Sequence, residues 1–104
     1  TLSVYKLVDG LYQKVWEDSR KMPFLHAIYP LYYKSVMYGI YGYRRNELEL
    51  NALYYDKKEK TYKSIQLDEG AGPTNVLCFK DGSVDKMIAA NRETNEIALY
   101  TVGD

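Results

Sequence analysis

The stretch Asn75–Val102, NVLCFKDGSVDKMIAANRETNEIALYTV, decides how the rest of the chain is interpreted. It contains three short apolar runs separated by two polar turns. The first turn carries Asp81-Gly82, and Asp-Gly between apolar runs is a strong hairpin signal because glycine adopts positive φ without steric cost. The stretch is therefore predicted to form three antiparallel strands.

The composition limits the classes of function. A chain of 104 residues fits one small domain, and its formal net charge of zero provides no bulk attraction to nucleic acid or to an anionic membrane. No apolar run approaches the roughly 20 residues of a membrane span. We therefore predict neither nucleic acid nor a membrane as a partner, and the sequence gives no indication of compartment.

Three further features of the sequence bear on chemistry, origin and fold. The single cysteine, Cys78, excludes an internal disulfide and a cysteine-based metal cluster, and its apolar surroundings predict a buried, inert thiol. The chain starts at Thr1 without a signal peptide, so we expect a processed product or a piece of a longer protein. The 12 tyrosines favour strands and half-buried surfaces, which indicates an all-β protein.

Alternating short apolar runs continue through the whole chain, and no segment shows a helical period. Pro30 is expected to end a strand because proline cannot donate to a ladder. Gly39 and Gly42 predict a bulge or a close backbone approach, while Glu49 and Asn51 predict a half-exposed strand. The predicted strands are Leu2–Leu7, Leu11–Trp16, His26–Tyr29, Val36–Tyr43, Leu48–Tyr55, Tyr62–Leu67, Val76–Phe79, Val84–Asn91 and Glu96–Val102.

These strands repeat with a spacing of about 48 residues, which is in the range of a four-stranded propeller blade. Leu2, Leu50 and Ile97 share one phase of the repeat. The predicted fold is all-β, with antiparallel four-stranded meanders of β-propeller type and strands named A to D from inner to outer. The single domain then consists of a partial C-D blade, a full blade and a partial A-B-C blade, at residues 1–18, 25–68 and 75–104. Coincidence among short hairpins of a small sandwich is the alternative.

The segment VDKMIAANRETNEIALY, with the preceding FKDG, resembles the FG-GAP or VCBS-type repeat of β-propellers. Many repeats of that family carry a calcium loop of the form D-x-D-x-D-G-x-x-D. Only Asp81, Gly82 and Asp85 match this form, and the turn of the other copy, 31–34, has no carboxylate. Because calcium takes six to eight oxygen ligands, we predict no metal, and no other cofactor is predicted.

About two blades cannot close a ring that typically needs four to eight. We consider three outcomes: self-association of about three or four chains, the remainder of a longer propeller, or a small sheet pair that is not a propeller. The offset starting phase favours ring closure, in which Leu11–Trp16 of a second chain completes the blade that ends at Ile97–Val102.

In a meander blade the B–C and D–A turns lie at one end of the sheets, and this end carries arginine and asparagine. Arginine suits bidentate recognition of carboxylate or phosphate, and tyrosines could stack on a carbohydrate, so an acidic ligand or a carbohydrate is predicted. A structural role, in which Arg44 and Arg92 pair with a nearby glutamate or carbonyl, is the alternative. The candidate ligand-binding residues are His26, Arg44, Arg45, Asn75, Asn91 and Arg92.

These features favour a non-enzymatic binding or interaction module for a ligand, a glycan or a protein. The resemblance also implies an alternative, because some propellers of this type belong to lyases or hydrolases. His26 with Arg44 or Arg92 near an axial pocket could then carry out acid–base chemistry. The sequence shows no paired catalytic groups, so no catalytic residue is predicted. A purely structural unit is the third hypothesis.

Overall fold

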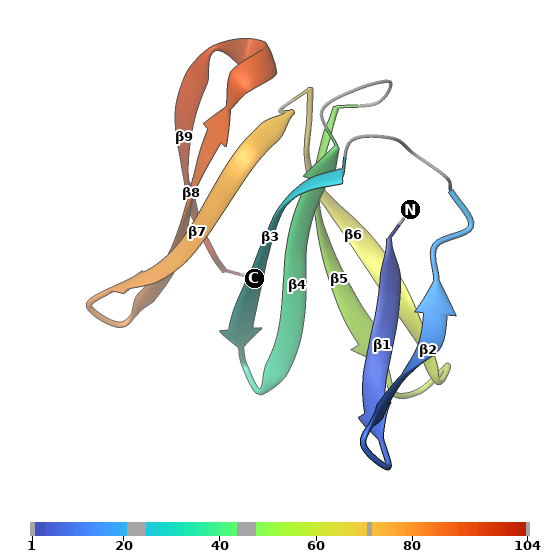
Figure 1. Cartoon of the computed structure of the whole chain (residues 1–104). Coiled ribbons are helices and arrows are strands. Elements are labelled where there is room, and N and C mark those ends of the chain that lie inside the picture. Colours follow the sequence, from blue (N-terminus) through green and yellow to red (C-terminus); the bar gives the residue numbers. More distant parts are fainter. Residues whose placement is uncertain (1, 21–24, 44–47, 71, 104) are drawn as a thin grey trace.

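The computed structural model describes residues 2–20, 25–43, 48–70 and 72–103, and these form nine strands and one short 3₁₀ turn (Figure 1). The all-β, antiparallel prediction is confirmed. The elements are β1 Ser3–Val8, β2 Leu11–Glu17, β3 Leu25–Tyr33, β4 Val36–Tyr43, β5 Glu49–Asp56, β6 Thr61–Glu69, β7 Pro73–Asp81, β8 Val84–Asn91, η1 Arg92–Thr94 and β9 Glu96–Thr101.

The strands form three meanders in chain order: β1-β2, β3-β4-β5-β6 and β7-β8-β9. Within each meander every strand pairs with its neighbour in sequence, and two of the connections are two-residue turns with positive φ. Asp9 and Gly10 have φ values of 51° and 81°, and Lys34 and Ser35 have 47° and 63°. Positive φ at both central residues is the geometry that matches the twist of a two-residue hairpin.

The hydrogen-bond register of the second sheet recurs in the third. Tyr29 lies opposite Ile40 in β3–β4, and Leu77 lies opposite Ile88 in β7–β8, a shift of 48 in both strands (77 − 29 and 88 − 40). Between β5 and β9 the shift is 47, since Ile40 faces Ala52 and Ile88 faces Leu99 (99 − 52). The sequence repeat is thus also a repeat of strand pairing.

The three sheets stack face to face, with β3–β6 in the middle (Figure 1). Alternate residues of β4 and β5 point to opposite faces, so the middle sheet contributes to two cores. Toward β7–β9, the buried side chains are Leu31, Ile40, Leu50, Ala52, Val76, Met87 and Ala89. Toward β1–β2, they are Leu2, Tyr41, Tyr43 and Leu53, against which Trp16 and Tyr62 pack. Burial of one such large apolar side chain stabilises the fold by about 1.5–3 kcal/mol.

Two predictions about individual strands are wrong. Pro30 does not end β3, which continues to Tyr33 with Pro30 opposite Gly39. Because β3 is an edge strand of its sheet, it accommodates a residue that has no N–H to donate. Glu49 and Asn51 are not on an exposed face: both are buried, because β1–β2 and the segment that follows β2 cover this side of β5.

The expected close approach at a glycine is confirmed for Gly42. A Cβ atom at this position would overlap the ring of Pro73 and would lie 2.7 Å from the carbonyl oxygen of Glu49. Gly39 has ordinary space, since the nearest atom to a Cβ would be Cβ of Leu53 at 3.9 Å. Gly42 therefore allows β7 to pack directly onto the middle sheet.

Candidate functional site

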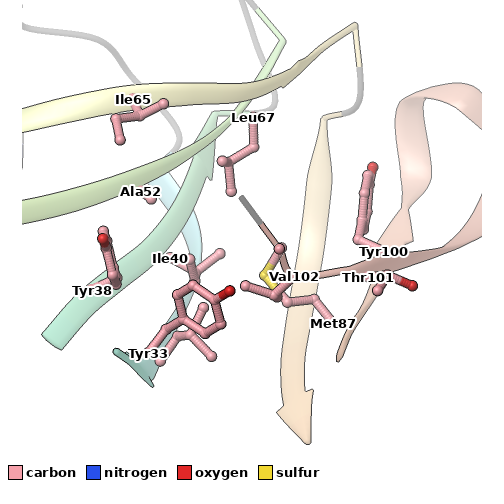
Figure 2. A pocket seen from close by; sticks show the side chains of 12 residues that line it. Tyr33, Tyr38, Ile40, Ala52, Ile65, Leu67, Met87, Tyr100, Thr101 and Val102 are labelled. Atoms are coloured by element: carbon pink, nitrogen blue, oxygen red, sulfur yellow. The ribbon is translucent and has the colours of Figure 1, made fainter. Parts of the chain in front are cut away.

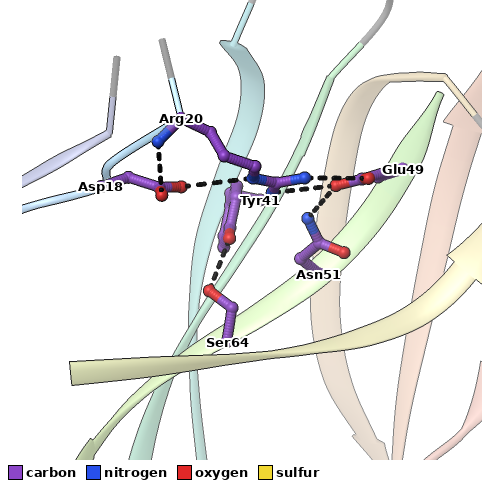
Figure 3. Close-up of polar contacts among 6 residues, drawn as sticks. All are labelled: Asp18, Arg20, Tyr41, Glu49, Asn51 and Ser64. Carbon is purple, nitrogen blue, oxygen red and sulfur yellow. Dashed lines mark hydrogen bonds and ion pairs between the residues drawn. The ribbon is translucent and has the colours of Figure 1, made fainter. Parts of the chain in front are cut away.

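A polar cluster lies between β1–β2 and β3–β6, near the end of the sheets that carries the β8–β9 turn (Figures 1 and 3). The guanidinium of Arg20, which follows β2, donates two hydrogen bonds of 3.1 Å to the two carboxylate oxygens of Glu49 in β5. Asn51 Nδ2 donates to Glu49 Oε1 at 2.8 Å. The Arg20 amide donates to Asp18 Oδ1 at 3.1 Å, which turns the chain back toward the sheet.

Hydrogen bonds and burial shift the pKa values of two side chains in this cluster. Hydrogen bonds to Glu49 raise the pKa of Arg20 above its usual value, so the bidentate pair stays charged. The guanidinium also lies 5.8 Å from the centre of the Tyr43 ring. Burial is the main cause that raises the pKa of Tyr43, so its hydroxyl is neutral at physiological pH.

The cluster opens into a cleft of about 290 Å³. Its walls combine aromatic rings with donors and acceptors: Trp16, Asp18, Arg20, Glu49, Asn51, Tyr62, Lys63, Ser64 and Gln66. Tyr41 holds Ser64 in place in this lining, because its hydroxyl forms a 2.6 Å hydrogen bond with Ser64 Oγ (Figure 3). A volume near 300 Å³ is at the lower limit of known small-molecule sites.

Next to this cleft, one fully buried acceptor has no donor among the described residues. The side chain of Asn51 is buried, and its Oδ1 has no hydrogen-bond partner among the described residues, while its Nδ2 is held by Glu49. An unsatisfied buried polar atom costs about 1–3 kcal/mol. The fold bears this cost, because the atom is fully shielded from solvent.

A second, apolar cleft of about 390 Å³ separates β3–β6 from β7–β9 (Figure 2). Its lining is mainly aliphatic and aromatic, and includes Ile65, Leu67, Met87 and Val102. The phenol of Tyr100, also in this lining, donates a 2.7 Å hydrogen bond to Asp68. Among the described residues, no charged side chain lines this cleft to orient a polar ligand, so the polar cleft is the better candidate site.

None of the site residues predicted from the sequence is among the described residues that line the polar cleft. Arg44 and Arg45 lie outside the described residues. His26 is half-buried in β3 opposite Gly42, and Asn75 is exposed with its Oδ1 accepting from the amide of Val76 at 3.0 Å.

Two of the predicted residues do lie together at the β8–β9 turn. Asn91 is buried and donates to Glu96 Oε1 at 3.4 Å, and the exposed Arg92 opens η1 beside it. Both line an open depression with Thr74 and Asn95. The binding and lyase or hydrolase roles assigned to these residues stay predictions.

The sequence interpretation did not single out Glu49, Asn51 or Ser64 as site residues. Glu49 and Asn51 alternate with apolar residues, which is the pattern of an exposed strand face. The available signal was the repeat, because Glu49 and Glu96 occupy the same position, opposite Tyr43 and Asn91. A carboxylate thus recurs at one strand end in both copies, although Glu49 is buried and Glu96 is exposed.

No protein-family model, curated protein or solved structure matches the chain. The described residues contain no group of three or more His, Cys, Asp or Glu side chains that could hold a metal ion. They also contain no helix with the length and apolar character of a membrane span.

Proposed function

We propose that this chain is a non-enzymatic binding module built from blades of β-propeller type. The meander order, the recurrence of the strand register and the face-to-face stacking of the sheets support this architecture. Each sheet then corresponds to one complete or partial blade, and the polar cleft is a site between two adjacent blades.

The observation that carries the binding role is the lining of the polar cleft, in which the rings of Trp16 and Tyr62 lie with the polar side chains of Ser64 and Gln66. A sugar presents hydroxyl donors on its edges and apolar C–H groups on its faces. The hydroxyls match the polar side chains of Asp18, Ser64 and Gln66 in the lining, and the faces match the aromatic rings. A small saccharide or another polyhydroxylated molecule is the ligand class that this cleft fits best.

Trp16 makes the proposal directly testable, because it is the one tryptophan of the chain and lines the cleft. Titration with glucose, galactose, N-acetylglucosamine and glucuronate should change its fluorescence saturably, with a dissociation constant on the order of 1 mM, about −4 kcal/mol. Gln66→Ala, which removes an exposed side chain of the cleft, should weaken the effect several-fold. Ser83→Ala, in the exposed β7–β8 turn, should leave it unchanged.

Two results would count against the proposal. One is the absence of a saturable response from every sugar, both in Trp16 fluorescence and in the amide shifts of Asn51 and Ser64. The other is a response that Gln66→Ala and Ser83→Ala alter equally, because the sugar would then act away from the cleft.

A further inference from the structure

One position of the repeat is buried in two of its copies and exposed in the third. Leu2, Leu50 and Ile97 share a phase of the repeat, and the first two have exposed fractions of 6% and 0%. Leu2 is covered by β3–β6, and Leu50 is covered by β7–β9. Ile97 is 76% exposed, because among the described strands no sheet follows β9.

The same difference in exposure extends over the whole face of β7–β9 that points away from the middle sheet. Ile40 and Ala52 are buried, whereas their counterparts Ile88 and Leu99 are exposed. Leu77, Ile88 and Leu99 lie opposite one another across the three strands. We call this surface the front face; it consists of Leu77, Ile88, Ile97 and Leu99.

At the other end of the stack, the face of β1–β2 that points away from the middle sheet is also uncovered. Tyr12 pairs with Leu7 next to the β1–β2 turn, as Tyr62 pairs with Tyr55 next to the β5–β6 turn. Tyr62 packs on Trp16 of the preceding sheet, but Tyr12 is 74% exposed. We call this surface the back face; it consists of the exposed side chains Tyr5, Leu7 and Tyr12.

We propose that the front face binds the back face of a second copy of this chain. Within one chain, a front face meets a back face twice, at the β1–β2/β3–β6 and β3–β6/β7–β9 contacts, so the new contact continues an interface that the fold already uses. Among the described sheets, β1–β2 is the one whose back face is uncovered. Large exposed apolar patches of this kind mark interaction sites.

The contact is head-to-tail, because two different surfaces meet. Such heterologous contacts form rings when the rotation closes and open filaments when it does not. The inference rests on the proposed blade repeat and does not involve the polar cleft, which lies within one chain. A failed sugar titration therefore does not contradict the proposed contact between copies, and a monomeric chain does not contradict the proposed sugar binding.

The test measures mass by sedimentation or light scattering from about 1 µM to about 1 mM, the range of weak to moderate association. The wild-type chain should form species larger than a monomer as the concentration rises. Leu99→Lys on the front face and Leu7→Lys on the back face should each raise the dissociation constant by about tenfold or more, because a charge would be buried in an apolar contact. Met37→Lys changes an exposed side chain outside both faces and should have no effect.

Mixing provides the decisive experiment. Leu99→Lys keeps an intact back face, and Leu7→Lys keeps an intact front face, so the mixture should form a one-to-one complex that neither variant forms alone. A wild-type chain that stays monomeric throughout overturns the proposal. Assembly that survives both variants, or a mixture without complementation, also overturns it. Because both residues are exposed, circular dichroism should show wild-type folding for each variant; if one is unfolded, Ile97→Lys or Tyr12→Lys replaces it on the same face.

Discussion

The ring of Trp16 in β2 lies 5.9 Å from the ring of Tyr62 in β6, with the two planes inclined by 50°. This contact joins two sheets whose strands do not pair with each other. Tyr62 also makes an edge contact with Tyr55, with 5.1 Å between the ring centres. The three rings form an aromatic row that fixes β1–β2 on the middle sheet, and two of them, Trp16 and Tyr62, line the polar cleft.

We expect Trp16→Ala to lower the free energy of unfolding by about 2–3 kcal/mol, somewhat below the cost for a fully buried aromatic side chain, because Trp16 is half-buried. Urea denaturation followed by circular dichroism would measure the loss. Tyr32→Ala removes an exposed aromatic ring from β3 and serves as the control, with an expected change within about 0.5 kcal/mol. Equal effects of the two substitutions would show that β1–β2 is not held by this row.

The Arg20–Glu49 pair yields a second prediction. Glu49→Gln keeps the size of the side chain but removes the charge that accepts both guanidinium bonds and the Asn51 bond. Bonds to a charged group are worth about 1.5–3 kcal/mol, so we expect a loss of stability in this range. Chemical denaturation of the variant and the wild type at the same pH would measure it.

The matched control for that pair is the exposed Lys14–Glu17 ion pair, with a distance of 3.0 Å between Nζ and Oε1. Glu17→Gln should hardly change the denaturation midpoint, since water screens such pairs. If Glu49→Gln were as harmless as Glu17→Gln, the cluster would contribute binding geometry without stability.

Gly42 allows a prediction about close packing. In Gly42→Ala the added methyl group would overlap the Pro73 ring and approach the Glu49 carbonyl oxygen to 2.7 Å. Overpacking of this kind typically costs about 1–3 kcal/mol, measurable as a lower thermal midpoint. Gly39→Ala, in the same strand but with only an ordinary 3.9 Å contact to Leu53 at the Cβ position, should be tolerated; a comparable loss there would point to strand propensity rather than contact.

The sequence predicted the strands and turns well because their signals are local. Asp9-Gly10 forms one two-residue turn, Asp81-Gly82 marks another that the structure places at Gly82-Ser83, and the alternation between such turns sets the strand register. The buried role of Glu49 could not be predicted in this way, because its partner Arg20 is 29 residues distant and lies outside its sheet. The continuation of β3 through Pro30 likewise depends on the edge position of that strand, which is a property of the sheet rather than of the local sequence.

Cys78 provides the last prediction, which concerns reactivity. Its side chain is half-buried in β7 against the core, where burial and, to a smaller extent, the charge of Asp85 raise the pKa of the thiol to about 11. An ordinary value of 9.0 would give on the order of 100-fold more thiolate at pH 8, and the thiolate is the reacting form.

Alkylation of the folded chain by iodoacetamide should therefore be slow at pH 8 and accelerate roughly tenfold per pH unit toward pH 11. In urea the rate should follow the lower pKa of an unfolded thiol. The direction in which stability changes with pH follows from the same shift in the pKa of the thiol. A thiol whose folded pKa is raised contributes its full stabilisation below the unfolded pKa near 9.0 and loses it as the pH rises through about 11. Cys78→Ala should remove this part of the alkaline loss of stability, whereas rapid alkylation of the folded chain at pH 8 would show that the thiol lies outside the core.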